Sequence, residues 1–434
     1  MILRCSACAT VAADGALLCA SCGDLLAFEL DPAQIDAAQL RATLAARRTS
    51  NDHRDRSGVW RFRELLPPVP DEAIVTLREG DLPLYAAHTG AAYAGVDRLS
   101  YLHQGMNPTA SFKDCGMTVA ISNARARNAR VAVCASTGNT SASMAAYAAR
   151  AGIHAVVLVP ATGISESKVA QTLDYGATVL AIDGDFDVAL AAVRKLDPTR
   201  VAVVNSINPY RIEGQKTAAF VLLEARDWRV PDWIVLPGGN LGNTSALGKG
   251  FREALALGLI DRLPRLAVVQ AAGAAPFARA FASGTDLEPV VAKTTATAIK
   301  IGAPASWKKA LREVRASGGT VLAVDDDAIA DARAVIGADG IGCEPASAAS
   351  LAGLRVLVAG GTIARGADVV AVLTGHVLKD PQYVAQYHAS GAARANPIVR
   401  VRNEAELLAR IDALSDSAVL DSPVRDESGE PVGR

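Results

Sequence analysis

The stretch HQGMNPTASFKDCGM (103–117) decides how the rest of this 434-residue chain is interpreted. A turn-rich segment, 107–111, leads into Lys113, and the residues from Asp114 to about Arg127 are predicted to form a helix. The N-terminus of a helix carries unpaired N–H groups and a partial positive charge, which disfavour an ammonium relative to the free amine. A lysine placed there suits Schiff-base chemistry, because the neutral amine is the nucleophile. An ordinary surface lysine is the alternative interpretation.

A glycine-rich loop, LPGGNLGN (236–243), follows the apolar run WIVLP and opens a predicted helix. It is not a Walker A loop, because Lys249 is followed by glycine, and its G-x-x-x-G spacing is not the dinucleotide fingerprint. Backbone N–H groups turned inward at a helix N-terminus form a site for a phosphate dianion, and glycine lets the main chain approach the anion. An ordinary glycine-rich turn is the alternative. The candidate anion-binding residues are Gly238, Gly239, Asn240, Leu241, Gly242 and Asn243.

The segment NPTASFKD resembles the lysine motif of the pyridoxal-phosphate enzymes of the tryptophan-synthase-β type, most closely that of the threonine synthases. Six further segments match in the same order, and together they span roughly residues 57 to 390. They are ASTGNTSAS (135–143), NSINPYRIEGQKT (205–217), LPGGNLGN (236–243), TATAIKIGAPASW (295–307), CEPASAAS (343–350) and LTGHVLKD (373–380).

The resemblance implies that Lys113 is the catalytic residue and carries pyridoxal phosphate as a Schiff base. It further implies that the loop 238–243 holds the cofactor phosphate, that Asn139 faces the ring hydroxyl and that the Thr374 hydroxyl faces the pyridine nitrogen. A helix cap is the alternative role for the Ser, Thr and Asn residues at 136–140. The residues that the resemblance assigns to substrate binding are Ser136, Thr137, Thr140, Asn205, Ser206 and Arg211. For the last three, a helix-capping Asn-Ser pair and a surface arginine are the alternative.

The implied reaction converts O-phospho-L-homoserine and water to L-threonine and phosphate, which would make the chain a carbon–oxygen lyase of threonine biosynthesis. The sequence departs from the family pattern at Ala110 and Val377, where glycine is usual, and at Cys115, where arginine is common. A related lyase that acts on another phosphorylated amino acid, such as β-replacement on O-phosphoserine in the manner of a cysteate synthase, is therefore the alternative. A catalytically silent cofactor-binding protein and a nucleic-acid-binding ribbon protein are hypotheses of different classes.

Two Cys-x₂-Cys pairs lie within the first thirty residues. Two such turns facing each other supply four thiolates at tetrahedral spacing, which predicts a structural zinc ribbon, with disulfides as the weaker alternative in a reducing compartment. Four protein ligands leave no open position for catalysis by the metal. Zinc-ribbon extensions occur on some members of the family that this chain resembles. The predicted ligands are Cys5, Cys8, Cys19 and Cys22.

Charge and hydropathy argue against nucleic-acid and membrane partners. The formal net charge is −1, and Arg4 is the one basic residue of the first thirty, so no nucleic-acid partner is expected. No apolar run is long enough to span a bilayer and the paired cysteines replace the apolar core of a signal peptide, so a cytoplasmic protein without a membrane partner is expected. The resemblance implies a homodimer and a small phosphorylated amino acid as substrate.

Short apolar runs, such as the predicted strand HAVVLVP (154–160), alternate with helical patterns after Lys113, which predicts an α/β fold with parallel sheets covered on both faces. The resemblance makes this the tryptophan-synthase-β-like fold, or fold type II, with two α/β domains and the cofactor in the cleft between them. The predicted division is a zinc ribbon (1–30), a helical linker (31–56), a large domain (57–114 and 211–415), a small domain (115–210) and a flexible tail (416–434).

Overall fold

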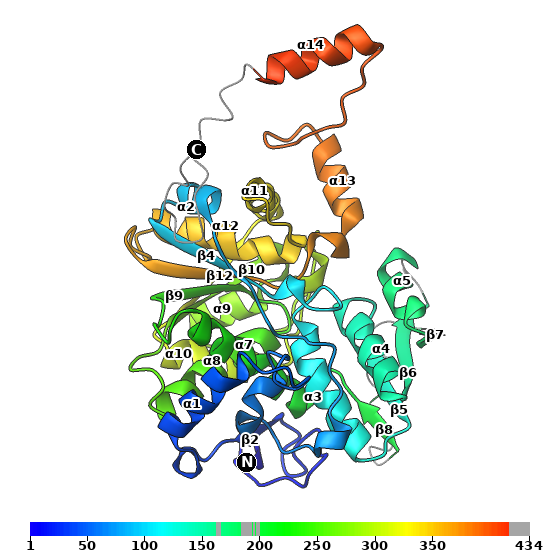
Figure 1. The fold of residues 1–434 in the computed structure, drawn as a ribbon, viewed down its shortest axis with the longest axis vertical. Helices are drawn as coiled ribbons and strands as arrows, with labels where there is room; N and C mark the ends of the chain where they lie inside the picture. The colour runs from blue at the N-terminus through cyan, green and yellow to red at the C-terminus, as the bar shows by residue number, and fades with distance from the viewer. Residues whose placement is uncertain (162–165, 184–192, 194–195, 197–199, 416–434) are drawn as a thin grey trace.

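The computed structural model describes residues 1–161, 166–183, 193, 196 and 200–415. The predicted tail, 416–434, lies outside the described residues. Two sheets with covering helices and an N-terminal hairpin organise this part of the chain (Figure 1). The predicted α/β class is therefore confirmed, while the division into domains stays a prediction.

The larger sheet has six strands in the order β11-β10-β9-β12-β4-β3, and all neighbours are parallel except β3, which runs antiparallel to β4. Its central strands are continuous apolar runs because both faces are buried. Along β9, for example, Trp233 and Val235 pack into one core cluster, while Ile234 and Leu236 pack into another. The strands are β3 (Leu84–Ala86), β4 (Arg98–His103), β9 (Trp233–Pro237), β10 (Arg265–Ala271), β11 (Thr320–Val324) and β12 (Asp368–Leu373).

Helices cover both faces of this sheet (Figure 1). One face packs against α2 (His88–Ala94), α11 (Asp326–Ala338) and α12 (Pro345–Ala359). The opposite face packs against α7 (Pro209–Ala225), α8 (Gly242–Ala256), α9 (Pro276–Ser283) and α10 (Trp307–Ala316).

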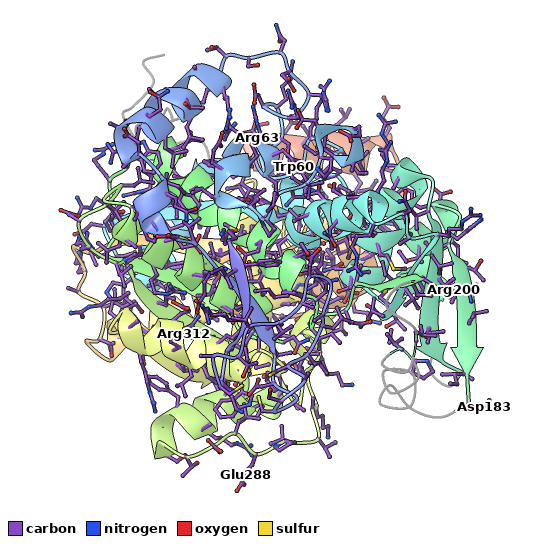
Figure 2. The ribbon with its side chains drawn as sticks, turned by 90° about the horizontal axis from the view of Figure 1, so that it is seen from below. Trp60, Arg63, Asp183, Arg200, Glu288 and Arg312 are labelled. Carbon is purple, nitrogen blue, oxygen red and sulfur yellow. The ribbon has the colours of Figure 1, made fainter. Side chains whose placement is uncertain are left out.

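The smaller sheet is fully parallel, in the order β7-β6-β5-β8. Asp183 and Arg200, next to its strands, lie on the side of the molecule away from the larger sheet (Figure 2). Helix α3 (Lys113–Ala126) packs against both α4 and α7, so it joins the two sheets and brings Lys113 between them. The other elements here are β5 (Val131–Ala135), α4 (Asn139–Ala151), β6 (His154–Pro160), α5 (Glu166–Asp174), β7 (Thr178–Ile182) and β8 (Val201–Val203).

The two ends of the described chain differ in how they pack. Strands β1 (Ile2–Cys5) and β2 (Leu26–Glu29) pair antiparallel and bury Leu3, Leu26 and Phe28 against the body, and α1 (Ala37–Arg47) lies in the predicted linker. Helices α13 (Pro381–Ala389) and α14 (Glu404–Ser415) extend outward (Figure 1). Among the described helices, none is both long and apolar enough to cross a membrane.

Candidate active site

Lys113 is the first residue of α3, and the chain before it is fixed to the end of β12. The backbone N–H of His376 donates to the carbonyl of Ala110 at 3.0 Å, and Ser111 forms an antiparallel bridge with Gly375. Asp114 is buried, and its carboxylate accepts hydrogen bonds from the backbone and hydroxyl of Thr109. The turn before the helix is thus held at both ends, which sets the direction in which Lys113 leaves the backbone.

The surroundings of Lys113 favour its neutral form. Burial and, to a smaller extent, the nearby Arg211 guanidinium lower the pKa of the Lys113 amine to about 7, while Glu344 acts in the opposite direction. Its Nζ lies 3.7 Å from the centroid of the Phe112 ring. An amine with this pKa is available as a nucleophile or as a proton acceptor near neutral pH.

Arg211 lies in the first turn of α7 and is buried, with 3% of its surface exposed. Its Nη1 donates to the carbonyl of Val204 at 3.2 Å, and its Nε has no hydrogen-bond partner. Within the described part of the chain, no carboxylate lies within ion-pair distance of it, and burial lowers its pKa to about 10. A buried guanidinium without a counter-ion carries a desolvation cost that an anionic ligand would offset.

The loop 238–243 has the geometry of an anion site. Leu241 adopts a left-handed backbone (φ 63°), and a Cβ added at Gly239 would lie 3.2 Å from the carbonyl oxygen of Ala298. The backbone N–H groups of residues 239–243 donate to no protein acceptor in the part of the chain that is described. Unpaired donors gathered at the N-terminus of α8 fit a phosphate group. The residues present therefore fit the phosphate end of pyridoxal phosphate.

Thr374, Asn139 and Glu344 form one connected group. The Thr374 hydroxyl lies 3.3 Å from Glu344 Oε1, to which it donates, and 3.0 Å from the hydroxyl oxygen of Ser347. The amide Nδ2 of Asn139 donates to Glu344 Oε2 at 3.1 Å. Glu344 is buried, and burial raises the pKa of its carboxyl group. The two residues expected on the cofactor ring are thus connected through a single carboxyl group.

Sequence reasoning missed Glu344. It belongs to the segment CEPASAAS, which was matched as a whole, and it directly precedes Pro345, the first residue of α12. A glutamate before a proline at a helix start is ordinary in sequence. What distinguishes Glu344 is its burial between two polar side chains from other elements, and the sequence gives no signal of that.

The other predicted substrate residues differ in how far their polar side chains are already hydrogen-bonded within the protein. The Asn205 amide is fully engaged with Ala135, donating to its carbonyl at 3.0 Å and accepting from its N–H at 3.1 Å. The hydroxyl oxygen of Ser206 accepts from Asn240 Nδ2 at 2.7 Å, which ties the 205–211 segment to the glycine-rich loop. Ser136, Thr137 and Thr140 lie partly exposed around the N-terminus of α4. Their roles toward substrate stay predictions.

The three departures from the family pattern have distinct local environments. Ala110 has φ 65°, a left-handed conformation in which a Cβ is strained. Cys115 is buried, with its Sγ 3.8 Å from Asn107 Oδ1. Val377 packs over Gly342, where an added Cβ would lie 2.7 Å from the valine Cγ1. Of these three positions, only Ala110 has a backbone conformation that favours glycine.

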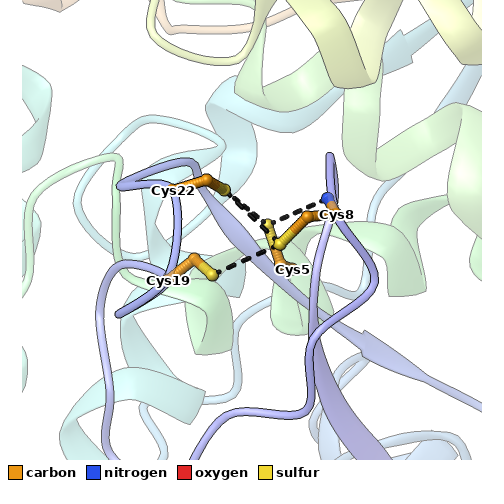
Figure 3. Close-up of side chains that lie close together, drawn as sticks. All are labelled: Cys5, Cys8, Cys19 and Cys22. Atoms are coloured by element: carbon orange, nitrogen blue, oxygen red, sulfur yellow. Dashed lines mark hydrogen bonds between the residues drawn. The ribbon is translucent and has the colours of Figure 1, made fainter.

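The four N-terminal cysteines converge (Figure 3). Their sulfur atoms all lie within 4.8 Å of one another, and the pairs Cys5–Cys22 and Cys8–Cys19 are 3.4 and 3.6 Å apart. All four are free thiols. Tetrahedral zinc with Zn–S bonds of about 2.3 Å places its sulfurs about 3.8 Å apart, so this donor set fits zinc.

Comparisons with known proteins agree with the geometry. The sequence pattern of the family described as pyridoxal-phosphate dependent enzyme matches residues 75–375. The threonine synthase of Methanosarcina acetivorans is 49% identical over 333 residues, which is 75% of this chain and 81% of the relative. The threonine synthase of Synechocystis is 45% identical over 363 residues, covering 83% and 92% of the two chains.

Solved structures share the fold at lower identity. The processed threonine deaminase isoform 2 of Solanum lycopersicum matches with a TM-score of 0.62 and 18% identity, covering 85% of this chain and 98% of that one. The L-serine ammonia-lyase of Rhizomucor miehei matches with a TM-score of 0.60 and 19% identity, covering 71% and 98%. The predicted fold type II is thereby confirmed. The chain belongs to the family of pyridoxal-phosphate-dependent enzymes and, within it, to the threonine synthases.

Proposed function

We propose that this chain is a threonine synthase that converts O-phospho-L-homoserine and water to L-threonine and phosphate. The observation that carries the proposal is Arg211, a buried guanidinium without a carboxylate partner among the described residues, close enough to Lys113 to lower its pKa. Arginine is suited to bidentate phosphate binding. A phosphorylated amino acid whose amine approaches Lys113 would place its phosphate at this guanidinium.

The other residues take complementary roles in this proposal. Pyridoxal phosphate, when bound, supplies an electron sink for charge that develops on the carbon chain of an amino acid. The loop 238–243 would hold its phosphate, while Asn139 and Thr374 would face its ring. Because the Thr374 hydroxyl is neutral, it provides weaker charge stabilisation than a carboxylate would, and proton transfer falls to Lys113.

Lys113 is suited to move protons at the substrate carbons. With a pKa of about 7, its amine can accept the Cα proton near neutral pH and return protons farther along the chain. Arg211 would hold the substrate phosphate until the carbon–oxygen bond breaks, and water would then add at Cβ. The products balance: one phosphate and one threonine for each O-phosphohomoserine and water.

The test is the release of inorganic phosphate from O-phosphohomoserine and, in parallel, from O-phosphoserine with and without sulfite. The proposal predicts phosphate and threonine in equal amounts from O-phosphohomoserine. Faster phosphate release from O-phosphoserine, or phosphate release without threonine, would overturn it in favour of another lyase activity.

We also propose that zinc occupies the cysteine cluster, that the protein is cytoplasmic and that it forms a homodimer. The sulfur spacing supports the metal, and free thiols favour a reducing compartment. Metal analysis of protein purified under reducing conditions should give one zinc per chain. Light scattering should give about twice the mass of the chain.

A further inference from the structure

The N-terminal ribbon, residues 1–30, lies directly against the helices that carry the candidate phosphate sites. Seen from below, its strand crosses in front of the helices of the larger sheet (Figure 2). Strand β2 contacts α7, the helix whose first turn contains Arg211, and Phe28 is buried in the same core cluster as Tyr210. The ribbon is therefore docked on its own catalytic body.

Tyr210, next to Arg211 in sequence, contacts two residues of the ribbon. Its ring meets the Phe28 ring edge-on, with centroids 4.8 Å apart, and its hydroxyl donates to the carboxylate of Asp14. Tyr210 directly precedes Arg211, and its backbone N–H is capped by Asn208 Oδ1 at 3.0 Å. Two ribbon residues thus hold the first turn of α7, from which Arg211 reaches the site.

A buried group of charges forms a second connection. Lys249 of α8 donates to the carbonyl of Phe28 at 2.6 Å and forms an ion pair with Glu213, two residues after Arg211 on α7. Lys309 of α10 is buried, and its Nζ donates to the carbonyl of Leu26 at 2.5 Å. Strand β2 therefore links α8, which begins at the glycine-rich loop, to α7.

The position of β2 depends on the cysteine cluster. Leu26 is paired in register with Cys5, and the backbone N–H of Cys19 donates to the carbonyl of Asp24 at 2.9 Å. A two-stranded hairpin is marginally stable alone, and four thiolates around a metal are the usual means of fixing such a unit. Loss of the metal would loosen the pairing of β1 with β2, which holds Phe28 and Asp14 against Tyr210.

We propose that the metal-bound ribbon is a positioning element of the substrate site, which fixes Arg211 through Phe28, Asp14 and Tyr210 and so sets the affinity for the phosphate of the substrate. Tyr210 is a positioning residue in this arrangement. The inference rests on the proposed function of Arg211 as the phosphate-binding residue. The proposal predicts that the cofactor stays attached at Lys113 when these contacts are lost.

The experiment compares zinc-loaded holoenzyme with holoenzyme treated with a zinc chelator under reducing conditions, with zinc content measured in both. Chelation should raise KM for O-phosphohomoserine about tenfold while kcat changes less than about threefold, since misplaced binding groups mainly weaken binding. Calorimetry should show a matching loss of affinity for inorganic phosphate. The absorbance of the bound cofactor should persist. Loss of that absorbance on chelation would contradict the proposal, because the ribbon would then be a general stabiliser.

Two variants test the contacts with zinc in place. Tyr210→Phe removes the hydrogen bond to Asp14, and Phe28→Leu removes the ring contact but keeps the carbonyl that Lys249 uses. Both should raise KM and weaken phosphate binding, whereas the control Lys308→Ala, which removes an exposed ion pair, should do neither. Wild-type KM and phosphate affinity in both variants would overturn the proposal. If the enzyme turns over no phosphoamino acid, the proposed function fails. The affinity for inorganic phosphate then still tests whether the ribbon positions Arg211. Unchanged affinity, or no saturable phosphate binding by the zinc-loaded enzyme, would then contradict it.

Discussion

The backbone N–H of Phe112 donates a hydrogen bond of 3.0 Å to the carbonyl oxygen of Thr374. Phe112 precedes the candidate lysine, and Thr374 carries the hydroxyl expected at the cofactor ring, so two residues 262 positions apart in sequence are fixed relative to each other. Because Thr374 is connected through Glu344 to Asn139, this one bond joins the lysine turn to both residues that are expected at the cofactor ring.

Replacing Arg211 by lysine should weaken substrate binding more than it slows turnover. Lysine keeps the charge but loses the planar fork that binds phosphate through two hydrogen bonds. We expect KM for O-phosphohomoserine to rise about 10- to 100-fold, the range for losing a hydrogen bond to a charged group. Steady-state kinetics measures this, with Arg229→Lys, an exposed position, as the control. An unchanged KM would remove Arg211 from the substrate site.

The same residue should control the pH at which Lys113 becomes reactive. Lys113 has a lowered pKa of about 7, so its neutral, reactive form is lost as the pH falls below that value. Arg211 contributes to the lowering, so Arg211→Gln should raise the pKa and move the profile to higher pH. The measurement is the rate of pyridoxal phosphate uptake by cofactor-free protein against pH. A profile that stays in place in Arg211→Gln, as is expected in the control Arg229→Gln, would show that the two groups do not interact.

Glu344→Gln should weaken cofactor binding. A glutamine amide can accept from only one of the two donors, Asn139 Nδ2 and the Thr374 hydroxyl, and its NH₂ group faces the other. A poorly satisfied buried group costs about 1–3 kcal/mol, so the Kd for pyridoxal phosphate should rise about 5- to 150-fold. Fluorescence titration of cofactor-free protein measures it. Glu288→Gln, at an exposed position (Figure 2), should bind as the wild type does. Equal affinities would mean that Glu344 does not act through these two residues.

Ala110→Gly should stabilise the protein. At φ 65° an alanine is strained by about 1–2 kcal/mol, which exceeds the entropy that glycine gains in the unfolded chain. We expect the free energy of unfolding to rise by about 1 kcal/mol, seen as a higher midpoint of thermal unfolding of cofactor-free protein. Ala42→Gly, on the exposed face of α1, should lower it by a similar amount because glycine is a poor helix former. A lower midpoint for Ala110→Gly would show that the left-handed turn is not strained.

Local patterns predicted much of the fold. The run His154–Pro160 forms β6 over those seven residues, and the helix predicted to begin near Lys113 forms from Lys113 to Ala126. Both predictions were right because the apolar pattern of an element and the residues that begin or end it lie close together in the sequence. The cysteine cluster also follows from local spacing.

Contacts between distant elements were not predictable. Nothing near Glu344 in the sequence shows that Asn139 and Thr374 lie on either side of its carboxyl group. The docking of β2 on Lys249 and Lys309 joins residues more than 200 positions apart in sequence. Lysines are rarely buried, so the sequence does not suggest that these two side chains lie in the interior. The sequence therefore predicts which elements form the site better than which side chains support it.

The central claim is that Lys113 carries the cofactor. Reduction of the holoenzyme with borohydride, followed by peptide mapping, tests it directly, because reduction makes the link between the lysine and the cofactor permanent. We expect a label on the peptide that contains Lys113, and none in Lys113→Ala protein. A label on another lysine, or a holoenzyme that takes up no label, would contradict it.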